Sequence, residues 1–278
     1  MLSSSRMSRP LLPFLVLFAA AAALPVAAQT SRPVPELGTA PIPRQLPTVP
    51  TPGQPPAASD EVKDPKTGCG AVMMNAEPSV GISWSGDCDY GLAQGKGVLQ
   101  WTRNGVPTDR YEGEMKDGLY EGQGKLTYAN KARYEGEFKA GERDGKGTYI
   151  FPSGARLTAE FREGRPQGHG MYVWSNGNRY IGDFRDNQRT GRGTMLFADG
   201  GRYEGEFVNG KMQGRGVRVW ANGGRYEGEW MDDRANGWGT KSGGPGGQVF
   251  TGTWTNGCFR ENQRWATVGA TAQACGFQ

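Results

Sequence analysis

The carboxylates that could do acid–base chemistry in this chain come in repeated pairs. Glu112 and Glu114 flank a glycine, and the same arrangement returns three times, at 135 and 137, 204 and 206, and 227 and 229. Two neighbouring carboxylates could act as acid and base in glycoside hydrolysis. That chemistry needs one unique pair, whereas a pair that recurs in repeat after repeat forms a ladder. We therefore predict that these residues are not catalytic.

The other reactive residue types also point away from an enzyme. His169, the only histidine, lies between two glycines with no second histidine or cysteine nearby in sequence to build a nucleophilic site. No Cys-x-x-Cys spacing is present for a metal. The Gly-x-Gly motifs lack the surrounding βαβ unit of a dinucleotide loop. We expect no catalytic residue, no cofactor-binding residue and no metal site.

Four cysteines, Cys69, Cys88, Cys258 and Cys275, lie in two local pairs near the two ends of the repeats. Cys88 and Cys258 belong to units seven repeats apart, which at ~4.8 Å per strand is on the order of 65 Å. A disulfide requires Cα atoms within ~7 Å. We therefore predict the disulfides Cys69–Cys88 and Cys258–Cys275, each of which staples a terminal segment over an end of the sheet.

One row of aromatic residues could form a binding groove. Its members recur at a fixed place in successive units: Trp101, Tyr128, Phe151, Trp174, Phe197 and Trp220. The rings could pack together as a thin core, since aromatic pairs stabilise by burial and by stacking. Alternatively, part of the row could stay open for a peptide, glycan or lipid. We expect the glycine at Gly113, and its equivalents, to lie across from or diagonal to these rings, which protects the strand.

All these residues are positioned by an internal repeat. Tyr-Glu-Gly-Glu or a variant of it begins at 111, 134, 157, 180, 203 and 226, a constant spacing of 23. A period of this size marks a supersecondary unit that buries its apolar face only by stacking on its neighbours. Such a protein is quasi-one-dimensional and presents extended surface rather than one deep pocket.

The unit from Tyr134 to Arg156 reads as a β-hairpin. Apolar and polar residues alternate from Tyr134 to Phe138 and again after Gly147, the pattern of half-buried strands. We predict the turn between Gly141 and Gly145. The arginine before each unit should share a face with the glutamates, forming ladders of weak exposed ion pairs. No helical period occurs in the unit.

The residues before the repeats predict export. A basic start with Arg6 and Arg9, an apolar run over 11–26 and small residues up to Ala28 are typical of a signal peptide (1–28), cleaved after Ala28. The Pro-rich segment 29–66 should be a disordered linker. The chain of 278 residues has a net charge of +4, or +2 without the two leader arginines, which gives no reason to expect nucleic acid.

The repeated Tyr-x-Gly-x-Phe/Trp pattern, followed by spaced glycines, resembles the MORN repeat over about residues 82–259. The resemblance implies an all-β, elongated, single-layer solenoid of consecutive antiparallel β-hairpins. Residues 67–81 and 260–278 should form the N-terminal and C-terminal caps. MORN arrays also accompany kinase and methyltransferase domains, but the rest of this chain is too short for either, so these activities are not carried over.

We therefore expect a non-enzymatic scaffold, periplasmic or secreted, in a Gram-negative bacterium. It would present an extended surface to a protein or cell-envelope partner. The alternative is a glycan- or lipid-binding module that uses the aromatic row, although the near-neutral charge argues against lipid headgroups.

Overall fold

The computed structural model describes residues 61–72 and 79–277. The predicted signal peptide and nearly all of the predicted linker lie outside the described residues. Strand β1 (Glu61–Lys63) falls within the range assigned to the linker, and it pairs with β2 (Gly70–Val72). Secondary structure therefore begins earlier than composition predicts.

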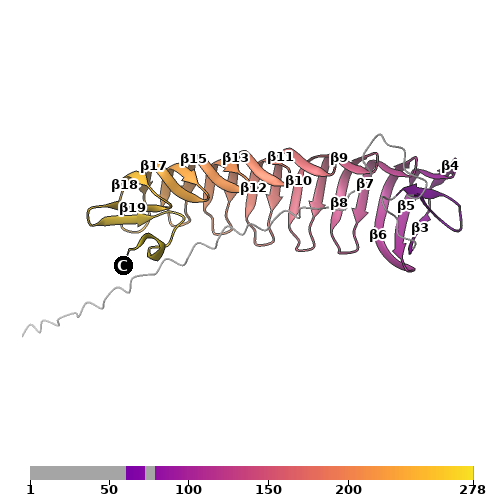
Figure 1. Ribbon diagram of the computed structural model, residues 1–278, viewed down its shortest axis with the longest axis horizontal. Coiled ribbons are helices and arrows are strands. Elements are labelled where there is room, and N and C mark those ends of the chain that lie inside the picture. The colour runs from indigo at the N-terminus through magenta and orange to yellow at the C-terminus, as the bar shows by residue number, and fades with distance from the viewer. Residues whose placement is uncertain (1–60, 73–78, 278) are drawn as a thin grey trace, which may run out of the picture. The chain divides into compact units, whose positions relative to one another are not determined.

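The repeats form one long sheet of consecutive hairpins (Figure 1). Eighteen of the described strands belong to it, and from β5 to β18 each pairs antiparallel with the next. The prediction of an all-β array with two antiparallel strands per unit is confirmed. The remaining strands of this sheet are β3 (Val80–Trp84), β4 (Asp87–Asp89), β5 (Leu92–Arg103), β6 (Val106–Lys116), β7 (Leu119–Thr127), β8 (Arg133–Lys139), β9 (Glu142–Ile150), β10 (Arg156–Arg162), β11 (Arg165–Val173), β12 (Arg179–Arg185), β13 (Gln188–Leu196), β14 (Arg202–Val208), β15 (Lys211–Val219), β16 (Arg225–Met231), β17 (Arg234–Ser242) and β18 (Phe250–Trp254).

The turn inside each hairpin is tighter than the glycine spacing predicts. Lys139 pairs directly with Glu142, so only Ala140 and Gly141 form the loop, and both have positive φ angles. Two residues with positive φ are the signature of a type I′ turn, whose twist matches that of the strands. The prediction of a turn between Gly141 and Gly145 is wrong, because Gly145 already lies inside β9.

The glycine register also differs from the prediction. Gly113 lies across from Gly124, which lies across from Gly136, so that glycines form a row across the sheet. The ring that covers them belongs to the tyrosine at the unit start, because a Cβ on Gly124 would meet the Tyr111 ring. The prediction that the glycine faces the Tyr128 row is wrong. Only Ala159 interrupts the row between β5 and β18, and there the unit start is Leu157 instead of tyrosine.

The unit-start tyrosines lie on the buried side of the sheet, which we call the core face. Tyr203 is fully buried and meets Phe207 and Trp230 edge to face, with ring centroids 5.3 and 5.2 Å away. Its hydroxyl donates to the Glu206 carbonyl at 3.1 Å, next to the β-bulge that follows Gly205. A buried hydroxyl needs such a partner. Tyr111, Tyr134, Tyr180 and Tyr226 repeat this arrangement.

Two buried arginines tie neighbouring hairpins together on the core face. Arg143 lies against the rings of Tyr134, Tyr149 and Phe161, and it donates to the Gly164 carbonyl at 2.7 Å. Arg189 does the same for the Gly210 carbonyl two units later. Cation–π contacts and a carbonyl partner make burial of these side chains tolerable.

Disulfides hold both ends of the described structure. Cys69 and Cys88 are bonded with Cα atoms 5.6 Å apart, and Cys258 and Cys275 with Cα atoms 5.7 Å apart. Both predicted pairings are confirmed. The second bond joins β19 (Cys258–Glu261), which pairs with β20 (Arg264–Thr267), to the 3₁₀ turn η2 (Gln273–Cys275). A loop of this length contributes roughly 3 kcal/mol in the chain-entropy model.

Alkaline pH should destabilise the array through its buried tyrosines. Burial, with the nearby Glu206 carboxylate, raises the pKa of Tyr203 above its ordinary value of about 10. A pKa raised in the folded state means that stability is fully present below about pH 10 and is lost as the pH rises beyond it. Urea unfolding from pH 8 to 11.5 should show this fall, and Tyr203→Phe should make it shallower. An equal slope in both proteins would contradict the assignment.

Candidate functional site

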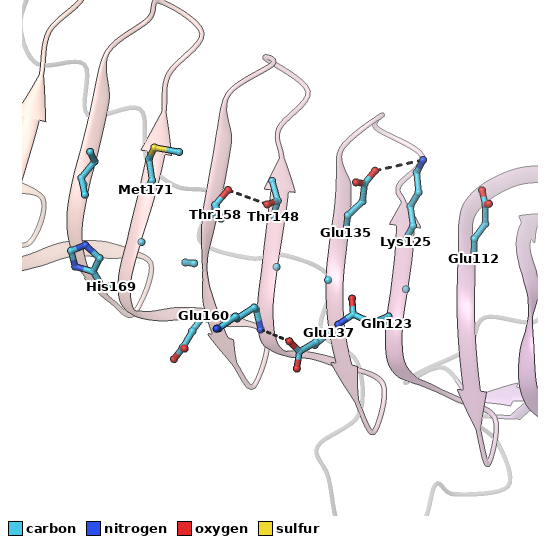
Figure 2. Close-up of a pocket in the computed structure, with 17 residues that line it drawn as sticks. Glu112, Gln123, Lys125, Glu135, Glu137, Thr148, Thr158, Glu160, His169 and Met171 are labelled. Carbon is cyan, nitrogen blue, oxygen red and sulfur yellow. Dashed lines mark hydrogen bonds and ion pairs between the residues drawn. The ribbon is translucent and has the colours of Figure 1, made fainter.

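A shallow trough crosses the polar face, the side of the sheet opposite the core face. It has a volume of about 1110 Å³ and runs across seven strands, from β6 to β12. Figure 2 shows two rows of side chains with glycine and alanine residues between them. The residues that line the trough are Glu112, Gln123, Gly124, Lys125, Glu135, Gly136, Glu137, Lys146, Gly147, Thr148, Thr158, Ala159, Glu160, His169, Gly170, Met171 and Ile181.

The trough follows from the bulges and from the alternation of faces along each strand. Each hairpin from β6 onwards has a register shift directly after its first-strand glycine or alanine, as between Gly113 and Glu114. A bulge bends the strand locally. Because the bend recurs at the same place, the side chains before it form one row and those after it form another. A Cβ at most of these glycines would point to the core face, where it would meet a tyrosine ring, so the residues of this row send no side chain into the trough.

Along one row of the trough, side chains on neighbouring strands are paired. Lys125 lies 3.5 Å from Glu135, and the hydroxyls of Thr148 and Thr158 are 3.0 Å apart. One unit further along the sheet, Met171 pairs with Ile181, and each side chain is 38% exposed. This position therefore changes from charged to polar to apolar along the trough.

The electrostatic balance of the trough is acidic. Its lining has four carboxylates against two lysines, a net charge of −2 with His169 neutral. Glu137 accepts a hydrogen bond from the Lys146 main-chain N–H at 3.3 Å. Glu160 lies exposed on the same row. One predicted pair of the ladder borders the charged region, where Arg110 contacts Glu112 at 3.1 Å.

The predicted aromatic groove lies on the core face. Its rings follow the second strand of each unit, apart from Trp101, which lies within β5. Trp101, Tyr128 and Phe151 are buried, whereas the last three members of the row are half-buried: Trp174, Phe197 and Trp220. Ligand binding by this row stays a prediction.

The half-buried end of the row encloses a cation. The Arg218 guanidinium carbon lies 3.3 Å from the centroid of the Phe197 ring and 5.8 Å from that of Trp220. Burial lowers the pKa of Arg218 to about 10, and Asp199 partly opposes the shift. Neither Nη1 of Arg218 nor Nε1 of Trp174 has a hydrogen-bond partner among the described residues. Stacking on the rings partly replaces the lost hydration of the cation.

His169 and the acidic residues do not gather into a reactive cluster. His169 is exposed, and its Nδ1 lies 3.3 Å from an Asp183 carboxylate oxygen. Within residues 61–72 and 79–277, no group of three or more histidine, cysteine or acidic side chains could hold a metal ion. In the same ranges, no helix has the length and apolar character needed to cross a membrane.

Sequence reasoning missed the trough as a site. The Glu ladders and the recurrent glycines are visible in the sequence. However, the ladders predict a solvated face, and the predicted binding groove lies along the aromatic row. The available signal was the change in residue type at one position of the repeat: Glu135 gives way to Thr158 and then to Ile181. An apolar residue at a position that other units fill with charge is not needed by the fold.

Comparison with known proteins supports the repeat assignment. The model of the MORN repeat matches seven segments, at 89–106, 111–133, 134–156, 158–179, 180–202, 203–225 and 226–248. None of the curated proteins compared with the chain matches it.

Solved structures that are similar include a TCP domain and a TCP10 domain. The TCP domain of SAS-4 (dCPAP) from Drosophila melanogaster, in complex with a proline-rich motif of Ana2 (dSTIL), is 14% identical, with a TM-score of 0.36 over 74% of this chain and 99% of that one. The TCP10 domain of Danio rerio CPAP is 15% identical, with a TM-score of 0.31 over 64% of this chain and 98% of that one. The seven matched segments cover more than half of the sequence, and the chain belongs to the MORN repeat family.

Proposed function

We propose that the protein is an exported, non-enzymatic scaffold that binds a partner protein on its polar face. The observation that carries the proposal is the open trough, which continues across seven strands with a floor free of large side chains. An extended polypeptide could lie along such a floor, between two rows of side chains that contact it from both sides. The repeats supply the rigidity that pre-organises a long binding surface.

Export to the periplasm or beyond the cell is part of this proposal. The leader pattern at 1–28 and two disulfides both fit an oxidising compartment. The partner would then be a protein of the cell envelope or one that is itself secreted.

A second candidate is a glycan- or lipid-binding role for the aromatic row. It rests on the half-buried rings of Trp174, Phe197 and Trp220, of which Phe197 and Trp220 lie against Arg218. Ring faces beside a cation suit a sugar or headgroup that carries negative charge.

Site-specific photo-crosslinking separates the two candidates. A photoreactive amino acid at Thr148, in the trough, is compared in living cells with the same amino acid at exposed Ser175, beside Trp174. We expect a discrete protein adduct at Thr148, identified by mass spectrometry, and none at Ser175. No protein adduct at Thr148 would refute the proposed function, and a glycan or lipid adduct at Ser175 would favour the second candidate.

A further inference from the structure

The trough has a graded chemistry along its length, and this gradient limits what can bind. On the side of the bend that precedes the bulge, successive units carry Glu112, Glu135, Thr158 and Ile181. On the other side, Glu137 and Glu160 lie in successive units (Figure 2). The carboxylates therefore lie toward β6, and the exposed apolar pair Met171–Ile181 lies at the β11–β12 end.

Opposite charge on the partner is favoured by the carboxylates. Four carboxylates against two lysines leave the lining at −2. One of the lysines, Lys125, already contacts Glu135, so it does little to repel a cation. An acidic segment would place like charges together along the trough, which is unfavourable.

The spacing of these features matches an extended chain. Equivalent residues in neighbouring units lie two strands apart, about 9.6 Å. A segment in the extended polyproline II conformation rises about 3.1 Å per residue with three residues per turn, so its every third residue lies on one face and meets the next unit. The trough as a whole spans six strand spacings, about 29 Å, which accommodates roughly nine residues.

We propose that the trough binds an extended segment of a partner protein, with basic side chains at Glu137 and Glu160 and an apolar side chain at Met171–Ile181. The three anchors would lie at every third residue of the segment. This inference rests on the proposed function and adds the chemistry of the partner to it. The apolar anchor fixes the register, because contacts with Glu137 and Glu160 alone would allow the segment to slip by one unit.

The test uses the full chain and fluorescein-labelled nonapeptides. One probe is Lys-Ser-Ser-Lys-Ser-Ser-Leu-Ser-Ser, made also in the reverse order because the trough does not define the direction of the segment. A second pair replaces both lysines with glutamate. Fluorescence anisotropy should show that at least one lysine peptide binds, that its affinity falls as NaCl rises from 50 to 300 mM, and that the glutamate peptides do not bind.

Matched variants locate the carboxylate anchors. The double change Glu137→Gln and Glu160→Gln should weaken binding about fivefold, the size expected for two exposed ion pairs. The control is Glu206→Gln with Glu229→Gln, which alters the same repeat positions outside the trough. Glu206 accepts the Arg215 N–H at 3.2 Å, as Glu137 accepts that of Lys146, so both doubles replace a charged acceptor by a neutral one in the same kind of contact. The control should change the affinity by less than twofold.

The apolar anchor has a natural control within the chain. Met171→Thr with Ile181→Thr recreates the facing pair that Thr148 and Thr158 form one unit earlier, so the sheet should tolerate it. Binding of the lysine peptide should weaken several-fold, whereas a peptide with serine in place of leucine should bind wild-type and variant equally.

Three results would overturn the inference: no binding of either lysine peptide, equal binding of the glutamate peptides, or equal losses in the two glutamine doubles. If the peptides fail while crosslinking at Thr148 still yields a protein adduct, the scaffold proposal stands and only the basic chemistry is wrong. If crosslinking yields no protein, the proposed function itself fails.

Discussion

Gly205→Ala is expected to destabilise the array by about 2–3 kcal/mol, the upper range for overpacking a filled core. Its Cβ would meet the Tyr203 hydroxyl and lie 2.7 Å from the Gly216 Cα. Backbone and a fully buried ring cannot both move aside without breaking the edge-to-face contacts of Tyr203. Urea unfolding followed by circular dichroism measures the loss.

The chain contains the control for this prediction. Leu157 and Ala159 occupy the equivalent positions two hairpins away, where the absence of a ring makes room for a Cβ. Adding Tyr203→Leu to Gly205→Ala should therefore cost less than the sum of the single changes. Strict additivity would show that the ring does not decide which residue fits.

Trp254→Ala should cost about 3–5 kcal/mol, as truncation of a buried aromatic does. Trp254 is 1% exposed, and its Nε1 donates to the Gly239 carbonyl at 3.1 Å. Its ring lies 5.2 Å from those of Tyr226 and Phe259, so it joins the last unit to the C-terminal cap. The free energy of unfolding in urea gives the value.

Trp174→Ala is the comparison, because the same side chain is only half-buried there and its Nε1 has no partner among the described residues. We expect less than half the loss seen at Trp254. Equal losses in the two variants would mean that the aromatic row is as much a part of the core at Trp174 as at the cap.

The repeat period was sufficient to predict the hairpins, the open sheet and both disulfides. Each depends on features that a single chain displays directly: alternation, spacing and the distance between units. The predicted position of the turn is wrong because the prediction counts Gly145 as a turn residue. Pairs such as Asn209-Gly210, which favour the two-residue type I′ turn, indicated the observed geometry.

The trough could not be predicted in the same way. It depends on a bulge in each hairpin, which forms both where a tyrosine hydroxyl binds the carbonyl directly after it, as Tyr203 binds Glu206, and in the unit that begins with Leu157. Alternation of residues along a strand reports which face a side chain occupies, but it carries no information about where that strand bends.

The alternation of faces along each strand has an evolutionary consequence. Tyr203 and Phe207 face the core while Glu204 and Glu206 between them face the polar side, so each 23-residue unit separates the residues that fold it from those that the proposed partner would contact. A mutation on the polar side of one unit leaves the buried residues of every unit unchanged. Duplication of a unit would lengthen the recognised segment by about three residues, and divergence of that copy could then add a new anchor while the older ones are retained.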